Sequence, residues 1–76
     1  MPGKITMENV EKVFTSVPKM EEANAKLAAE VTKGFIELAR TVIANVPDCA
    51  HRSAALRDIL GAKWACIDAI AKGGEI

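Results

Sequence analysis

Apolar residues recur every three or four positions along two long stretches of the chain, the spacing of an amphipathic α-helix. The first stretch begins at Pro18, since proline is tolerated at the first helical position, and it stops before Pro47. It predicts a helix over residues 18–46. Its main apolar stripe comprises Met20, Asn24, Leu27, Val31, Gly34/Phe35, Leu38, Val42 and Asn45/Val46, and a second apolar flank comprises Ile36, Ala39 and Ile43.

The second stretch predicts a helix over residues 48–72, with Asp48 as its N-cap, or Ser53 as an alternative start. Lys72 followed by glycine is its stop signal. Its apolar stripe comprises Leu56, Ile59/Leu60, Trp64, Ile67 and Ile70/Ala71. Two helices of similar length joined by a tight connection favour an antiparallel hairpin.

The N-terminal segment, residues 1–17, predicts a short helix over residues 6–14 with Thr6 as its cap. The residues just before Pro18 are expected to be extended, because the residue preceding a proline avoids the α region. The expected fold is therefore all-α, an antiparallel helical hairpin with a short N-terminal helix in a single domain over residues 1–76.

Length and composition point to assembly. A chain of 76 residues buries a small core and is marginal alone, and half of its residues are hydrophobic while only 4% are aromatic. Two facing helices bury one stripe each, so the second flank and the alanines of the last helix would stay exposed in a monomer. An exposed apolar strip usually marks an interface, so we expect a homo-oligomer.

The net charge and the lack of long apolar runs limit the kinds of partner that the chain can bind. Ten basic residues balance ten acidic ones, which argues against binding of polymeric nucleic acid. Binding of a small anion remains possible, because it needs only two or three cations. Neither an apolar leader nor a membrane-length apolar run occurs, so a cytoplasmic protein that does not bind membranes is expected. Cys49 and Cys66 are expected to be reduced thiols.

No residue pattern predicts catalysis. Cys49, His51 and Cys66 lack the paired short spacings of a zinc site, and Cys49 and His51 are two residues apart, on different faces of a helix. Nucleophile–base pairs and glycine-rich phosphate loops are also missing. A protein without enzymatic activity, metal or cofactor is expected.

Two groups of cations could hold a small anion. His51 and Arg52, with Arg57 one turn later, lie where a helix start exposes backbone N–H groups, or they form a solvated, salt-bridged surface. Lys26, Lys33 and Arg40 recur at seven-residue intervals beside the apolar stripe; they form either a solvated flank or the lining of a pocket between protomers.

Two roles are also possible for Phe14. It could fasten the short helix to the hairpin, or its ring could stack on a flat ligand.

The last helix resembles a known family. It is similar to the helical hairpin domain of small phage proteins. The similarity lies in the run Pro47-Asp48-Cys49-Ala50-His51-Arg52-Ser53-Ala54-Ala55-Leu56, followed by Ala62, Trp64-Ala65 and Ala69-Ile70. Phe14, Pro18 and Leu38-Ala39 extend the resemblance upstream, over roughly residues 13–71. This family includes phage sponges that sequester the cyclic-nucleotide signals of bacterial CBASS and Thoeris immunity.

The resemblance implies a homo-oligomer, commonly a hexamer, that binds cyclic di- or trinucleotides between protomers in the host cytoplasm without cleaving them. Phe14 would stack on a base, and Lys33, or less favourably Lys26, would meet phosphate. The candidate ligand-binding residues are Phe14, Lys26, Thr32, Lys33, His51 and Arg52. The alternative is an oligomeric helical protein–protein interaction module of phage origin.

Overall fold

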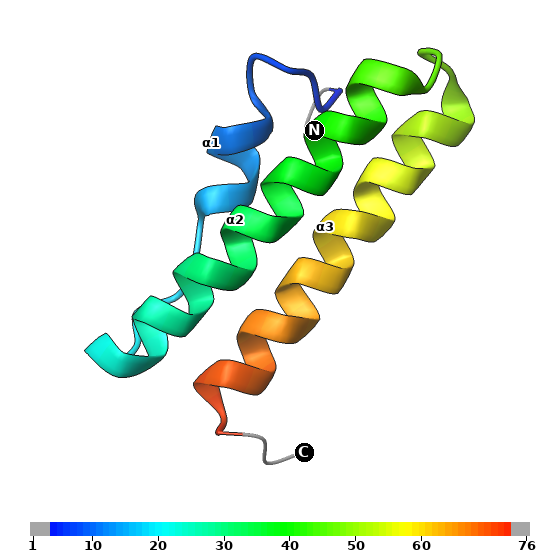
Figure 1. Cartoon of the computed structure of the whole chain (residues 1–76). Helices are drawn as coiled ribbons and strands as arrows, with labels where there is room; N and C mark the ends of the chain where they lie inside the picture. Colours follow the sequence, from blue (N-terminus) through cyan, green and yellow to red (C-terminus); the bar gives the residue numbers. More distant parts are fainter. Residues whose placement is uncertain (1–3, 74–76) are drawn as a thin grey trace.

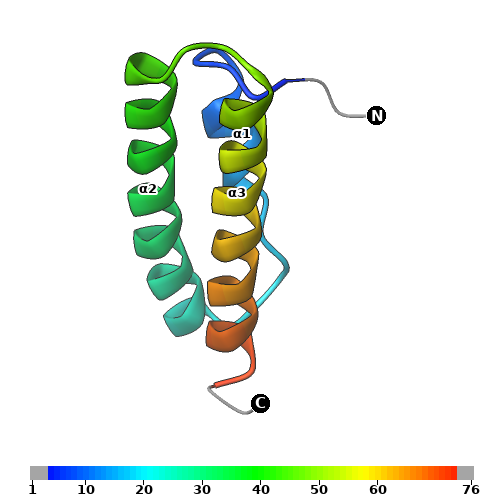
Figure 2. The same ribbon diagram turned by 90° about the vertical axis from the view of Figure 1, so that its right-hand side faces the viewer.

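The structure, a computed structural model, describes residues 4–73 and contains three helices in that range: α1 (Val10–Thr15), α2 (Glu22–Asn45) and α3 (Ala50–Ala71). All regular structure in residues 4–73 is helical, which confirms the all-α prediction. Figures 1 and 2 show α2 and α3 running antiparallel side by side, with α1 against one face of this pair. The opposite face of the hairpin is not covered by another helix (Figure 2).

The first long helix begins at Glu22, so the prediction of a start at Pro18 is wrong. The reason is distance. Phe14, near the end of α1, belongs to the same core cluster as Ile36, which lies about 21 Å along α2 from Glu22 at 1.5 Å per residue. Residues 16–21 must cover that distance, and six residues reach about 20 Å only when they are extended. We call this segment the linker.

The ends of the other helices also differ from the prediction. The short helix begins at Val10, because the carbonyl of Thr6 accepts hydrogen bonds from the N–H groups of Asn9 and Val10 and forms a turn ahead of it. Helix α3 begins at Ala50 with Cys49 as its N-cap residue, so the assignment of Asp48 as N-cap is wrong. The predicted stop is confirmed, since Gly73 follows α3 with a positive φ of 63°.

The core lies where the three helices meet. Val10 and Phe14 of α1 are fully buried and cluster with Ile36 and Ala39 of α2 and Leu56 of α3. Half-buried apolar side chains surround them, namely Ile5, Val13, Phe35, Val42, Ile43, Ile59 and Leu60. Helix α1 is thus an integral part of the core despite its six residues.

The buried face of α2 is the predicted flank and not the predicted main stripe. Ala28, Thr32, Ile36 and Ala39 are its buried residues, whereas Leu27 is 56% exposed and Leu38 is 48% exposed. The core is centred on the predicted flank because α1 packs against the Ile36 and Ala39 side of α2. The stripe that the sequence placed in the core therefore leaves its outer edge open to solvent.

Candidate functional site

A cavity of about 500 Å³ lies between α2 on one side and α1 with the linker on the other. Its volume falls in the range of small-molecule sites, about 300–1,000 Å³. Helix α2 supplies most of the lining, and Glu11, Thr15 and Val17 form the opposite wall. The α2 residues that line it are Ala25, Ala29, Thr32, Lys33, Ile36, Glu37 and Arg40.

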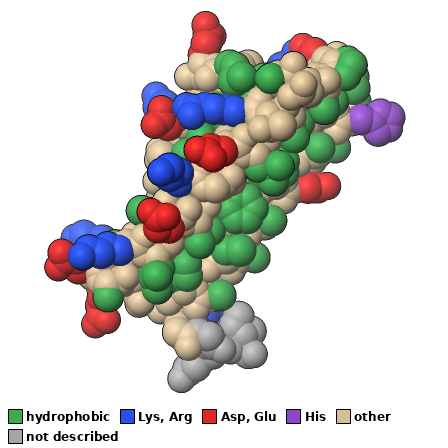
Figure 3. Space-filling model, in the orientation of Figure 1, with side chains coloured by type: hydrophobic (Ala, Val, Ile, Leu, Met, Phe, Trp, Pro, Cys, Tyr) green, Lys and Arg blue, Asp and Glu red, His purple; other side chains and the backbone are tan. Residues whose placement is uncertain are grey.

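Two cations and two carboxylates share the lining of this cavity. The Nη2 atom of Arg40 lies 3.5 Å from Oε1 of Glu11, and both side chains are substantially exposed. Such exposed pairs contribute only about 0–1 kcal/mol, so a stronger anion could displace the Glu11 carboxylate. Lys33 and Glu37 complete the charged rim. Figure 3 shows basic and acidic side chains gathered along the α2 side of the molecule, beside a band of hydrophobic ones.

Thr32 is the polar residue set deepest in the cavity wall. It is 5% exposed, and its buried Oγ1 atom has no hydrogen-bond partner. A buried hydroxyl left unpaired costs about 1–3 kcal/mol. The hydroxyl can both donate and accept, but its oxygen is buried, so the side chain must turn toward the cavity before it can pair with a polar ligand atom.

Two of the six sequence-predicted residues line the cavity. They are Thr32 and Lys33, which are consecutive in the sequence. Lys26 is exposed on α2 outside the lining, and His51 is exposed in the first turn of α3. Phe14 is fully buried in the core, so in this conformation its ring has no free face for a base. Of its two roles, the structure matches the one in which it fastens α1 to the hairpin.

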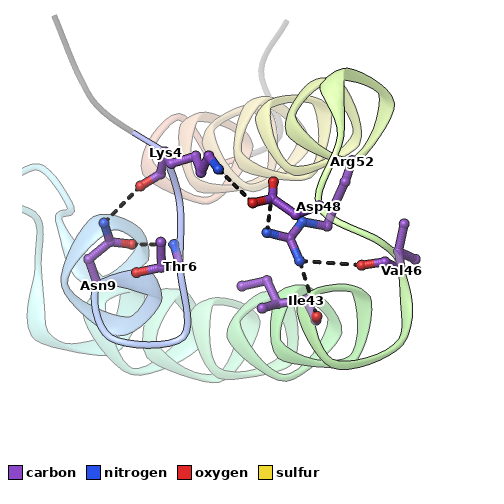
Figure 4. Close-up of polar contacts among 7 residues, drawn as sticks. All are labelled: Lys4, Thr6, Asn9, Ile43, Val46, Asp48 and Arg52. Carbon is purple, nitrogen blue, oxygen red and sulfur yellow. Dashed lines mark hydrogen bonds and ion pairs between the residues drawn. The ribbon is translucent and has the colours of Figure 1, made fainter.

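The guanidinium of Arg52 contacts the turn between α2 and α3 (Figure 4). Its Nη1 atom donates to the carbonyl oxygens of Ile43 and Val46, each at 3.3 Å, and thereby satisfies backbone acceptors at the end of α2. Its Nη2 atom lies 3.3 Å from Oδ1 of Asp48. The Nη1 and Nη2 atoms are therefore engaged by the turn between α2 and α3, which matches the salt-bridged interpretation of Arg52, while its buried Nε atom has no hydrogen-bond partner.

Asp48 also binds the N-terminal segment. Its Oδ2 atom accepts a hydrogen bond of 2.6 Å from Nζ of Lys4 (Figure 4). This hydrogen bond, assisted by the charges of Lys4 and Arg52, holds the pKa of the Asp48 carboxyl below its usual value of 3.8. Asp48 therefore joins three segments of the chain instead of capping α3.

Lys63 is a residue that the sequence analysis missed. It is fully buried, its Nζ atom donates a 2.6 Å hydrogen bond to the carbonyl of Ser16, and the same atom lies 3.7 Å from the centre of the Trp64 ring. Burial lowers the pKa of this amine from its usual 10.5. Helical spacing could have revealed it, because Lys63 lies seven residues after Leu56 and four before Ile67, on the buried side of α3.

The remaining chemistry-bearing residues do not converge. Cys49 and Cys66 are both exposed free thiols. Over residues 4–73, no group of three or more histidine, cysteine or acidic side chains is placed to hold a metal ion. No helix in the same range is long and apolar enough to cross a membrane.

The described residues thus define a three-helix all-α protein with an amphipathic cavity beside its core. No protein-family model, curated protein or solved structure matched the chain.

Proposed function

We propose that this protein binds cyclic oligonucleotide immune signals and sequesters them without cleavage, as a phage counter-defence sponge in the cytoplasm of an infected bacterium. The observation that carries the proposal is the cavity lined by two cations, Lys33 and Arg40, beside an apolar surface. The likeness of the last helix to phage hairpin domains supports the same ligand class.

The lining suits a small amphipathic anion. Lys33 offers an ammonium to a phosphate, and Arg40 can add a second cation once it releases Glu11. Thr32 adds a hydroxyl once its buried oxygen turns toward the cavity. Ala25, Ala29 and Ile36 supply an apolar floor against which a ribose or a base can lie.

The base is therefore held differently from the sequence hypothesis. Phe14 is committed to the core, so apolar contact with the aliphatic floor replaces aromatic stacking in this proposal. The cavity is formed by one chain, so one protomer supplies the phosphate-binding cation and the apolar surface together.

We also propose a homo-oligomer, with the hexamer as the state that the family resemblance implies. Three large apolar side chains of the first long helix and its end are at least 38% exposed, namely Leu27, Leu38 and Val46. Figure 3 shows hydrophobic side chains gathered in a band beside the charged ones. A second copy would remove this surface from water.

A thermal-shift screen tests the ligand class. Cyclic di- and trinucleotides and cyclic ADP-ribose isomers are compared with their linear counterparts. A ligand at 100 times its dissociation constant stabilises the folded state by about 2.7 kcal/mol, which raises the melting temperature of a domain this size by about 10 °C or more. Recovery of the bound ligand intact by mass spectrometry establishes binding without turnover. A flat screen, or shifts equal with linear controls, contradicts the proposal.

Lys33→Met tests the site. Loss of a charge-assisted hydrogen bond to phosphate is expected to weaken binding by about tenfold or more, since such bonds contribute about 1.5–3 kcal/mol. Lys26→Met is the matched control, because Lys26 lies seven residues earlier on α2, is exposed and does not line the cavity. Isothermal titration of both variants measures the difference. Equal affinities would remove Lys33 from the site.

The exposed apolar band supports a second candidate, a helical protein–protein interaction module. Such a module predicts no thermal shift with any nucleotide and a specific host protein that co-purifies with the chain. Substitution of Leu38 by glutamate, which leaves the cavity untouched, would then abolish capture of that partner.

A further inference from the structure

One side chain of α3 holds the linker between α1 and α2. Nζ of Lys63 donates to the carbonyl oxygen of Ser16 at 2.6 Å. Among residues 4–73, this is the single hydrogen bond between the linker and α3. The linker residues from Ser16 to Lys19 are otherwise exposed, and no regular secondary structure fixes them.

The anchored carbonyl lies in the wall of the cavity. Thr15 and Val17, the two neighbours of Ser16, both line the cavity opposite the α2 residues. A backbone held at Ser16 therefore fixes the position of both wall side chains. The cation that fixes them comes from a helix that contributes no residue to the lining.

The fold alone does not explain a lysine at this position. The neighbours of position 63 on the buried side of α3 are Leu56 and Ile67, and burial of an ammonium is unfavourable unless it has partners. Methionine would fill a similar volume without that penalty. The carbonyl of Ser16 and the ring of Trp64 are the partners that keep the ammonium buried.

We infer that Lys63 is a positioning residue for the cavity: its ammonium, held against the Trp64 ring, fastens the Thr15–Val17 wall to α3 and thereby slows the escape of a bound ligand. The role in ligand escape rests on the proposed function, whereas the role in holding the wall stands without it.

The first test uses the free protein and trypsin. Lys19 lies in the linker, so cleavage after it reports how often the linker leaves the helices. Lys63→Met is expected to speed this cleavage at least tenfold relative to Lys72→Met, an exposed lysine at the end of the same helix. Cleavage after Lys26 and Lys33 in α2 should be the same in both variants, which separates linker release from global unfolding. Equal cleavage after Lys19 would overturn the inference.

The second test measures ligand kinetics, with 3′,3′-cyclic GMP–AMP as the probe. Lys63→Met is expected to raise the dissociation rate constant at least tenfold while the association rate constant changes little. Lys63→Arg, which retains a charged donor, should restore part of the slow dissociation. Rates equal to those of wild type would overturn the role in ligand retention. If wild type does not bind the probe, the proposed ligand class fails for it, and the trypsin experiment still decides whether Lys63 holds the wall.

Discussion

Replacement of Phe14 by alanine is expected to lower the free energy of unfolding by about 3–5 kcal/mol, the range for removal of a buried phenylalanine. Phe14 is fully buried among Val10, Ile36, Ala39 and Leu56, so its loss opens a cavity where all three helices meet. For a domain of this size, 1 kcal/mol corresponds to about 4–8 °C, so the melting temperature should fall by at least about 12 °C. Thermal unfolding followed by circular dichroism measures the shift.

Two controls separate the core role of Phe14 from a role in ligand stacking. Phe35→Ala removes a ring that is only half buried and should destabilise the protein less. Phe14→Leu keeps an apolar side chain in the core but removes the aromatic face, so ligand affinity should stay close to that of wild type. A Phe14→Ala protein with the melting temperature of wild type and a lost ligand response would contradict the core assignment and restore the stacking role.

The helices could be predicted because their signals are local. Pro18 and Pro47 bracket the first long helix, Gly73 ends the second, and the three-four spacing of apolar residues marks both. The exact starts could not be read locally. The start of α2 at Glu22 depends on how far the linker must travel from the end of α1, which is a property of the tertiary fold.

The buried face of α2 was beyond the reach of periodicity. Leu27 and Leu38 belong to one apolar stripe and Ile36 and Ala39 to another, and both have helical spacing. The stripe of Ile36 and Ala39 is the buried one because α1 packs against it. A hydrophobic pattern shows that a face can be buried, but the position of the neighbouring element decides which face is.

The candidate site also combines residues that the sequence could indicate with residues that only the tertiary fold brings into place. Lys33 and Arg40 were recognisable as a ridge of cations beside the apolar residues of one helix, and both line the cavity. The opposite wall is formed by Thr15 and Val17, whose positions depend on a hydrogen bond between residues 47 positions apart in the sequence. The choice between the two interpretations of Arg52 could not be made from the sequence, because its partners, the carbonyls of Ile43 and Val46, become neighbours only when the turn folds back.

Replacement of both Leu27 and Leu38 by glutamate is expected to dissociate the proposed homo-oligomer. These leucines, 56% and 48% exposed, lie eleven residues apart on one side of α2, away from the cavity lining. Burial of unpaired carboxylates in an interface costs several kcal/mol, so the dissociation constant of the assembly should rise by at least about 100-fold. Sedimentation velocity at micromolar concentration measures the change. Ala44→Glu is the matched control, because Ala44 is exposed on the charged edge that carries Arg40 and Glu37.

The dissociated protein also locates the ligand site. The cavity is built from α1, the linker and α2 of one chain, and neither substituted leucine lines it. Substitutions at such independent sites usually have separable effects, so the monomer should bind the ligand with an affinity within about fivefold of wild type. If binding is lost together with assembly while the monomer keeps its helical circular dichroism, the site lies between protomers, as the sequence resemblance implies, and the cavity described here is at most one half of it. An assembly state unchanged by the two glutamates would instead show that this face of α2 is not the interface.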